Sequence, residues 1–246
     1  MNDDTGSFLS DKPVPPGDRL IVALDVPTAT EAISLVDLLG DAVSFYKVGL
    51  ELVTGTGYRQ VLDELRRRAK RIFLDLKLFD VPETVASAVR QLQPLGVDFV
   101  TVHGNEEMMQ AAVRERGNVK ILAVTVLTSL DQKDLDDLGF EVDVEQLVLS
   151  RARRALDAGC DGVISSGIEV PALRRNLGDR LVVVSPGIRP VLNREIDDQK
   201  RTVDVEQAFR NGADYIVVGR PVRRATDPRE AALDIQRRVG ELFGRS

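Results

Sequence analysis

The sequence predicts one α/β domain folded as a (β/α)8 TIM barrel. Short apolar runs alternate with amphipathic segments after about residue 18, and the runs are continuously apolar rather than alternating. Continuous runs are typical of parallel strands that are covered on both faces. Eight such units without a linker-like break favour a single closed barrel over residues 18–246, preceded by a flexible tail at 1–17.

The expected strands are short apolar runs, several of which follow a Gly-x-Asp turn. The segments "GVDFVTVHG", "GCDGVISSG" and "GADYIVVGR" repeat that turn and the strand after it, which indicates a recurring helix, turn and strand unit. The predicted strands span 19–26, 45–50, 71–77, 99–104, 120–127, 161–166, 181–187 and 215–221.

The segments between these runs have helical patterns, several of which begin at Thr or Pro and end at Gly. The clearest helices are expected over 30–40, 58–70, 82–93, 144–159 and 228–243. A doubly wound open sheet is the competing architecture. It is disfavoured because "LDVPTAT" follows the first strand, where a dinucleotide-binding sheet carries Gly-x-Gly-x-x-Gly.

Composition excludes several classes of function. The 246 residues carry a net charge of -6, so no overall basic field favours nucleic acid or an anionic membrane. Aromatic residues make up only 4% of the chain and Trp is absent, which argues against base stacking. Cys160 is the single cysteine, so no internal disulfide forms, and we expect a reducing cytoplasmic setting. The N-terminal segment lacks a secretory pattern, and no apolar run approaches the roughly 18 residues of a membrane span.

Polar residues gather where the predicted strands end, which is the face of a (β/α)8 barrel that carries chemistry. In "FLDLKLFDVPET", Asp75 and Lys77 alternate with Leu74 and Leu76, so the charged pair is expected to face the barrel mouth. Lys47 lies within the second predicted strand. The polar residues that end or follow the other predicted strands are Asp25, Asp75, Lys77, His103, Thr128, Ser129, Ser165, Ser166 and Arg220.

Two interpretations of the charged residues remain open at this point. Buried charges could form a structural network that only closes the barrel. Four ionisable groups on the first three strands exceed that need, and strongly coupled charges in a cleft are typical of functional sites, which favours function. His103, the only histidine, is interpreted as a mouth residue as readily as a catalytic base, so it receives no role in the mechanism. No set of His, Cys and carboxylate residues has zinc-like spacing.

The last two strands indicate a phosphate site. Gly187 and Gly219 end these strands, where backbone amides and a following helix hold phosphates, and Arg220 adds a bidentate donor. Glycines that only form tight turns are the alternative. The polar stretch 188–204 between the strands is too long for an ordinary connection, so we expect a lid there, with a functionless insertion as the alternative.

These residues carry a family resemblance. "DLKLFDVPET" resembles the Asp-x-Lys-x-x-Asp-[Ile/Val]-Pro-x-Thr signature of the orotidine 5'-phosphate decarboxylase family. Six further segments are similar to that family in order and spacing, so the resemblance extends over about 19–240. They are "ALDVP", "YKVGLEL", "VTVLTSLD", "SPGIRP", "DDQKR" and "VVGRPV".

The resemblance implies decarboxylation of orotidine 5'-monophosphate to uridine 5'-monophosphate (UMP), the last step of de novo pyrimidine synthesis, without a metal or an organic cofactor. It implies that Lys77 protonates C6 of the pyrimidine and that Asp75 lies beside the substrate carboxylate. It also implies that Lys47 and Asp75 hold Lys77, and that Asp25 and Lys47 contact the ribose hydroxyls.

The resemblance further implies a homodimer with shared active sites, because Asp80 and Thr84 of the family signature reach the site of the other subunit. Thr128 and Ser129 are implied to contact the pyrimidine. Gln199, Gly219 and Arg220 are implied to bind the phosphate, with Arg189 as a further substrate-binding residue at the base of the lid.

Two rival functions stay open at the level of sequence. One is another phosphosugar decarboxylase or aldolase of the same barrel group, which uses a similar Asp-x-Lys-x-x-Asp and a magnesium ion. The other is a non-catalytic sensor of phosphorylated ligands, which would have no need of the proton donor Lys77.

Overall fold

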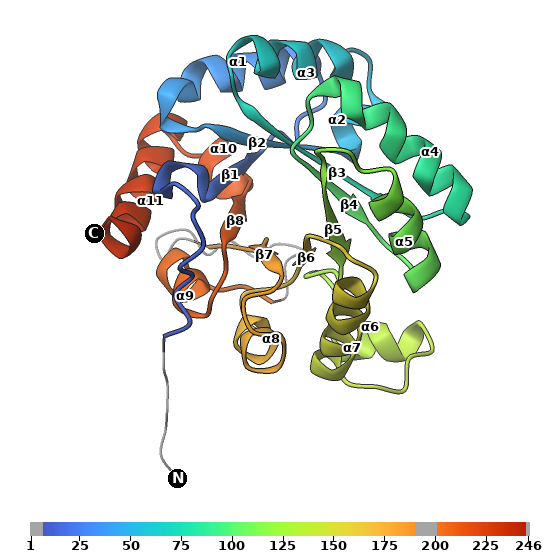
Figure 1. Cartoon of the computed structure of the whole chain (residues 1–246). Coiled ribbons are helices and arrows are strands. Elements are labelled where there is room, and N and C mark those ends of the chain that lie inside the picture. Colours follow the sequence, from blue (N-terminus) through green and yellow to red (C-terminus); the bar gives the residue numbers. More distant parts are fainter. Residues whose placement is uncertain (1–6, 190–200, 245–246) are drawn as a thin grey trace.

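The computed structural model describes residues 7–189 and 201–244. It contains a closed barrel of parallel strands in sequence order, in which β8 pairs with β1 (Figure 1). The predicted (β/α)8 fold is therefore confirmed. The strands are β1 (Leu20–Ala23), β2 (Phe45–Gly49), β3 (Arg71–Leu78), β4 (Phe99–Val102), β5 (Lys120–Val124), β6 (Gly162–Ile164), β7 (Val182–Ser185) and β8 (Tyr215–Val218).

Each strand falls within its predicted range except β3, which runs one residue further, to Leu78. Most predicted ranges are too long at the carboxyl end. The reason is that apolar residues after the strands, such as Leu24 and Val126, are also buried against the helices and continue the apolar run. Hydrophobicity therefore marks the buried segment, whereas the ladder of hydrogen bonds ends earlier.

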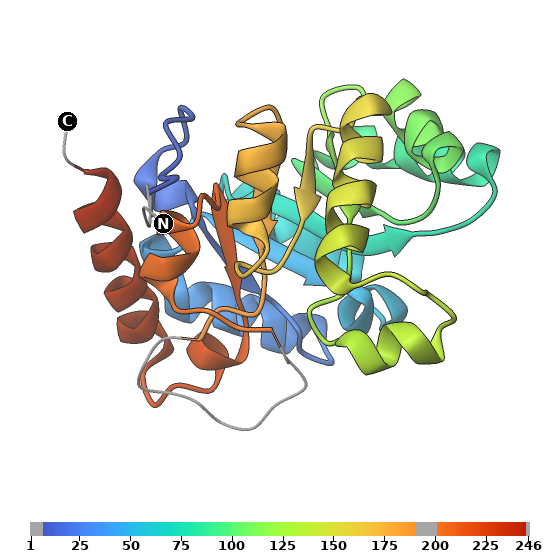
Figure 2. The same cartoon turned by 90° about the horizontal axis from the view of Figure 1, so that it is seen from below.

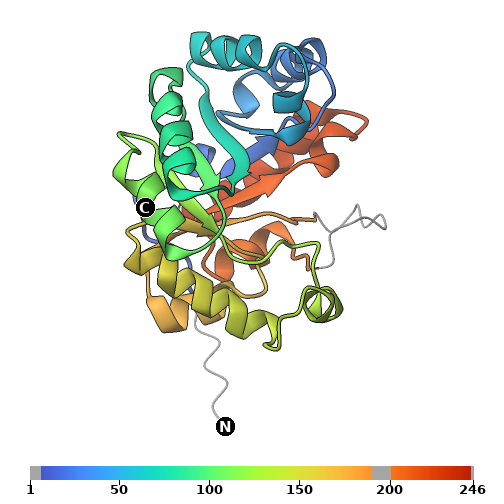
Figure 3. The ribbon, with the colours of Figure 1, turned by 90° about the vertical axis from the view of Figure 1, so that its right-hand side faces the viewer.

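Helices surround the barrel (Figures 1, 2 and 3). They are α1 (Ala29–Leu39), α2 (Leu50–Thr54), α3 (Tyr58–Arg67), α4 (Pro82–Leu92), α5 (Glu106–Arg114), α6 (Gln132–Asp137), α7 (Val144–Asp157), α8 (Val170–Leu177), α9 (Val205–Arg210), α10 (Arg220–Arg223) and α11 (Pro228–Phe243). Short 3-10 turns lie at Pro16–Asp18, Gly40–Ala42 and Gln93–Leu95.

Local sequence explains where the predicted helices begin and end. The Thr28 hydroxyl accepts a hydrogen bond from the Glu31 amide and caps α1, while Pro82 occupies the first turn of α4. The range predicted as 58–70 ends as a helix at Arg67, because Ala69 adopts a left-handed conformation with φ of 52°. No helix in the described part of the chain is both long enough and apolar enough to cross a membrane.

Two layers of apolar side chains form the core. The larger layer lies between the strands and the helices, and the smaller one fills the barrel interior. In the interior, Phe45, Phe99 and Tyr215 begin their strands and make edge-to-face contacts with ring centroids 5.0–6.0 Å apart. The Arg71 guanidinium lies 4.2 Å from the Phe45 ring centroid. The amino end of the barrel is therefore closed by aromatic packing, and chemistry is left to the carboxyl end.

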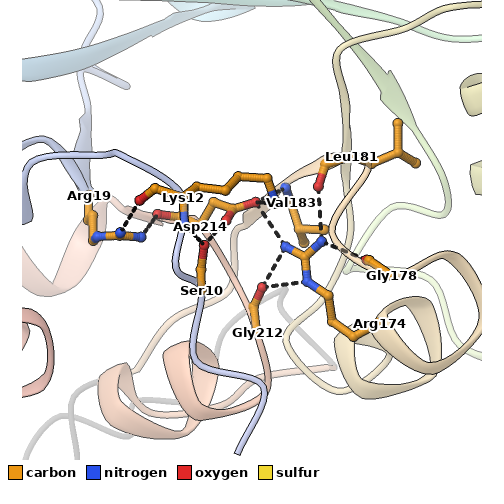
Figure 4. Close-up of polar contacts among 9 residues, drawn as sticks. All are labelled: Ser10, Lys12, Arg19, Arg174, Gly178, Leu181, Val183, Gly212 and Asp214. Atoms are coloured by element: carbon orange, nitrogen blue, oxygen red, sulfur yellow. Dashed lines mark hydrogen bonds and ion pairs between the residues drawn. The ribbon is translucent and has the colours of Figure 1, made fainter.

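A buried ionic network joins the N-terminal segment to this closed end (Figure 4). The carboxylate of Asp214, just before β8, is fully buried and contacts the Arg174 guanidinium at 2.9 Å and the Lys12 ammonium at 3.3 Å. The Ser10 hydroxyl donates to the same carboxylate, and Val14 packs against the interior core. Within 7–17, the part of the predicted loose tail that the structure describes, Ser10, Lys12 and Val14 make contacts with the barrel. A polar, proline-rich composition does not reveal a buried partner as distant in sequence as Asp214.

Candidate active site

A cavity of about 530 Å³ opens at the carboxyl ends of the strands. It brings together most of the residues that the sequence analysis assigned to the substrate site, from the first three strands and from the segments after β5, β7 and β8. The assigned residues that line it are Asp25, Lys47, Asp75, Lys77, Thr128, Ser129, Arg189, Gly219 and Arg220. Apolar side chains such as Phe73, Val124, Ile164 and Val217 form other parts of its wall.

Acids and lysines alternate along one wall of the cavity. The Lys47 ammonium lies 2.9 Å from Asp25 Oδ1 and 3.5 Å from Asp75 Oδ2. The Lys77 ammonium lies 2.8 Å from Asp75 Oδ1. The order Asp25, Lys47, Asp75, Lys77 forms a charged row in which each group contacts a neighbour of opposite sign.

This charged row shifts the pKa values of its inner members. Burial alone would lower the pKa of the Lys47 ammonium, but Asp75 and Asp25 outweigh it, so the pKa of Lys47 is raised. Burial alone would raise the pKa of Asp75, but Lys47 and Lys77 outweigh it, so the pKa of Asp75 is lowered. Both groups are therefore ionised at neutral pH.

An irregularity in β3 brings Lys77 to Asp75. Leu74 pairs with Val100 and Leu78 pairs with Val102, so four steps along β3 match two along β4. Lys77 has a left-handed backbone with φ of 49°, which is uncommon for a lysine and points to a constraint. The predicted placement of Asp75 and Lys77 at the mouth is confirmed, but simple alternation along a regular strand does not describe how Lys77 reaches it.

Thr101 of β4 fixes this irregularity, and the sequence offered no sign of it. Its hydroxyl donates to Asp75 Oδ1 at 2.9 Å and accepts from the Lys77 amide at 2.9 Å. Its side chain is fully buried. One hydroxyl therefore orients the central carboxylate and satisfies the strained backbone. The one sequence-based route to Thr101 is the alternation of side chains along the predicted strand "FVTVHG", which places Thr101 on the interior face of the barrel.

Glycine at position 49 leaves room for the charged row. A Cβ atom there would lie 3.0 Å from the Lys47 ammonium nitrogen and 3.1 Å from Asp25 Oδ1. Both contacts are tighter than ordinary Cβ contacts, so a side chain at this position would require the Lys47 ammonium or the Asp25 carboxylate to shift by a few tenths of an ångström. The glycine of "YKVGLEL" is therefore explained by the space that the charged side chains need, and not by the conformation of a turn.

The part of the cavity wall that follows β7 and β8 is cationic. Gly187 has a positive φ of 76° that suits glycine, and Gly219 caps the short helix α10. Arg220, predicted from the end of the last strand, lines this part, and so does Arg189, which the family resemblance implied. Arg223 and Arg224 also line the cavity, although the sequence analysis gave them no role. The sequence "GRPVRR" could have predicted this, because Arg223 and Arg224 follow Arg220 by three and four positions and therefore lie on the same side of a helical turn.

Five of the predicted positions that the structure describes do not line this cavity, and two of them, Ser165 and Ser166, are fully buried. Asp80 and Thr84 are exposed and do not line it. His103 lines a second cavity, where its ring lies 5.6 Å from that of Phe79. Burial, Arg151 and Lys77 lower the pKa of His103, so the imidazole is neutral at pH 7. Gln199, with most of the predicted lid at 188–204, lies outside the described residues.

Within the described ranges, no group of three or more His, Cys, Asp or Glu side chains is placed to hold a metal ion. The fold and the cavity define a class of (β/α)8-barrel enzyme in which paired lysines and carboxylates face a cationic site suited to a phosphate.

Comparison with known proteins agrees with this class. A model of the "Orotidine 5'-phosphate decarboxylase / HUMPS family" matches residues 18–235. An orotidine 5'-phosphate decarboxylase from Methylococcus capsulatus is 63% identical over 96% of this chain and 98% of that protein. One from Stenotrophomonas maltophilia is 49% identical over 94% and 96% of the two chains. The crystal structure of orotidine 5'-phosphate decarboxylase from Lactobacillus acidophilus superimposes with a TM-score of 0.80 at 35% identity, covering 90% of this chain and 99% of that one.

The chain therefore belongs to the orotidine 5'-phosphate decarboxylase / HUMPS family and is an enzyme of the carboxy-lyase class. The resemblance stated from "DLKLFDVPET" and the six further segments is confirmed.

The lowered pKa of Asp75 leads to a prediction about stability in acid. Ionised Asp75 stabilises the fold above its unfolded pKa of about 3.8, and this contribution is lost as the pH falls through the lower folded value. Asp75→Asn removes this titration. We expect the unfolding free energy of the wild type, relative to the variant, to be constant between about pH 5 and 7 and to fall below about pH 4. Urea unfolding of both proteins at about pH 7 and below about pH 4 measures this difference in unfolding free energy. A wild type that becomes more stable relative to Asp75→Asn in acid would contradict the assigned charge pairing.

Proposed function

We propose that this enzyme converts orotidine 5'-monophosphate to UMP and carbon dioxide, the final step of de novo pyrimidine nucleotide synthesis. The observation that carries the proposal is the charged row from Asp25 to Lys77, which shares one cavity with Arg189 and Arg220. The substrate suits both features, since it has a phosphate to bind and a carboxylate to lose. The names of the relatives from Methylococcus and Stenotrophomonas support the same substrate.

Binding is proposed to occupy the cavity from end to end. Arg189, Gly219 and Arg220 bind the phosphate, together with Gln199 as predicted from the sequence. Asp25 and Lys47 contact the ribose hydroxyls. Thr128 and Ser129, which line the cavity after β5, contact the pyrimidine. This orientation directs C6 of the pyrimidine toward Asp75 and Lys77.

The chemical step needs a group that stabilises and then protonates a carbanion. The bond between C6 and the carboxylate breaks, carbon dioxide leaves, and the electron pair stays on C6. The Lys77 ammonium stabilises this charge and donates a proton to C6 to form UMP, and the resulting amine recovers a proton from solvent. Asp75, 2.8 Å from the Lys77 ammonium, holds the donor in place. Phosphate binding away from C6 supplies binding energy that organises the charged row.

The reaction is proposed to need neither a metal ion nor an organic cofactor, because Lys77 supplies both the charge and the proton. This distinguishes the proposal from the rival magnesium-dependent lyase of the same barrel group. Turnover that survives exhaustive chelation supports the decarboxylase, and a metal requirement supports the rival.

A homodimer with shared sites is part of the proposal. Asp80 and Thr84 are exposed and lie outside the cavity of their own chain. Between Lys77 and α4, the side chains of Phe79 and Val81 are 67% and 62% exposed. Phe79 borders a second cavity of about 800 Å³ with a largely apolar wall. Exposed apolar side chains of this kind are typical of a protein interface, which would carry Asp80 to the cavity of a second copy.

Removal of the proton donor tests the mechanism. Lys77→Ala should lower kcat for orotidine 5'-monophosphate by at least ~10³-fold, because both charge stabilisation and protonation are lost. Binding of UMP should change by less than about tenfold, since its phosphate contacts remain. Loss of orotidine absorbance measures the first, and calorimetric titration measures the second.

Lys120 provides the matched control, because it lies exposed at the amino end of β5, away from the cavity. Lys120→Ala should leave both readouts unchanged. A Lys77→Ala enzyme with nearly normal turnover would show that the assigned donor is wrong.

Subunit mixing tests the shared site. Asp80→Asn and Lys77→Ala should each be inactive alone. After subunit exchange, a hybrid dimer contains one site with neither substitution, so an equal mixture should recover up to about a quarter of the wild-type activity if exchange is random. The absence of recovery, once exchange has been verified by native mass spectrometry, would contradict the shared site.

A further inference from the structure

Arg201 stands out among the residues that the mechanism leaves without a role. Its side chain is buried, with the residue only 9% exposed, and it forms an ion pair with Glu169, which is 6% exposed. A buried ion pair in isolation carries a large desolvation penalty and is a poor source of stability. The position of this ion pair beside the cavity therefore suggests a role other than stabilising the fold.

Arg201 holds the loop after β5. Its guanidinium donates to the carbonyl oxygens of Val126 at 3.1 Å and Leu127 at 2.9 Å. Its backbone amide donates to the carbonyl oxygen of Thr128 at 3.3 Å. Val126, Leu127 and Thr128 all line the cavity, and Thr128 is the proposed pyrimidine contact. One residue thus fixes three consecutive positions of the pyrimidine end.

The same stretch of chain also holds the phosphate end. Two residues after Arg201, Val203 forms a parallel bridge with Ile188, and its carbonyl oxygen accepts from the Arg189 amide at 2.9 Å. Arg189 lines the cavity as a proposed phosphate contact. The backbone from Arg201 to Val203 therefore connects the loop after β7 to the loop after β5.

The loop after β6 completes this assembly. The Ser166 hydroxyl donates to the Arg201 carbonyl oxygen at 3.1 Å. A Cβ at Gly167 would lie 2.4 Å from Val203 Cγ2, so the approach of the two segments excludes any side chain at that position. Arg201 to Val203 thus packs against three loops at once, which is more constraint than an ordinary connection has.

We propose that Arg201, held by Glu169, is a positioning residue that couples the phosphate end of the cavity to its pyrimidine end. The inference rests on the proposed function. Arg201 itself does not line the cavity and is not a catalytic residue. It acts through the backbone of Val126 to Thr128, so that fixing the phosphate at Arg189 also fixes the surface on which the pyrimidine lies.

The test compares two substrates that differ only in the phosphate. Arg201→Lys keeps the charge but loses the planar set of donors that reaches Glu169 and two carbonyl groups at once. We expect kcat/KM for orotidine 5'-monophosphate to fall by ~10- to 100-fold and that for orotidine, the substrate without phosphate, to fall by less than ~3-fold. Long incubations at high enzyme concentration make the slow turnover of orotidine measurable.

Arg174→Lys is the matched control. Arg174 is also a buried arginine that pairs with an acid, Asp214, and donates to carbonyl groups, but it lies at the closed amino end of the barrel (Figure 4). Its substitution disturbs a comparable network and should leave the ratio of the two kcat/KM values unchanged.

The outcomes separate the hypotheses. Equal loss on both substrates, or the same change of ratio in Arg174→Lys, would overturn the coupling role and leave Arg201 structural. A wild-type enzyme that does not act on orotidine 5'-monophosphate would instead overturn the proposed function. Should Arg201→Lys fail to fold, Glu169→Gln, which keeps an acceptor for the guanidinium, must change the ratio in the same direction, and an unchanged ratio would contradict the proposal.

Discussion

The electrostatics of the barrel mouth constrain the rest of the site. The side chains of Lys47 and Asp75 are only 12% and 15% exposed, and a charge so withdrawn from water is tolerated only with an opposite charge beside it. The pairing explains three features that look unrelated in the sequence. A side chain at position 49 would crowd Lys47 and its partner Asp25. The irregular part of β3 carries Lys77 beside Asp75, and the Thr101 hydroxyl holds that irregularity. In the proposed mechanism the same row supplies the proton.

The two ends of the barrel differ in how their buried charged side chains are paired. At the amino end, Asp214 is satisfied by Arg174, Lys12, Ser10 and a backbone amide, and aromatic rings fill the space nearby. At the carboxyl end, the charged row lines an open cavity, where Lys77 retains 32% exposure of its side chain. A buried carboxylate held by several donors gives rigidity, whereas charges that face a cavity remain available to a substrate.

The sequence predicted those parts of the molecule that depend on local pattern. Continuous apolar runs located the strands, and position at a strand end located Asp25, Lys47, Asp75, Lys77 and Arg220 at one cavity. Features that depend on contacts between distant segments were not predicted. The left-handed backbone of Lys77 is held by Thr101 from the next strand, and composition gives no trace of such a bond.

Arg201 illustrates the same limit. It lies in "DDQKR", within the stretch predicted as a lid, where the sequence analysis gave Arg201 no role. Its partners Glu169 and Val126 come from two other loops. Arg223 and Arg224 were within reach of a local argument, since they follow Arg220 by one helical turn. The N-terminal segment was predicted as loose from its polar, proline-rich composition, which gives no sign of a partner 204 positions away, the distance from Ser10 to Asp214.

The central claim is that an ammonium group beside Asp75 performs the reaction, and chemical replacement of that group tests it most directly. Lys77→Cys should be inactive, and alkylation with bromoethylamine should restore turnover of orotidine 5'-monophosphate, because it rebuilds an ammonium at nearly the same distance from the backbone. The other cysteine, Cys160, is buried, and burial raises the pKa of its thiol to about 12, so the reagent should select position 77. Methylation of the new thiol, which adds no charge, should restore nothing. A fully aminoethylated protein that remains inactive, or an unmodified Lys77→Cys enzyme with normal turnover, would contradict the account.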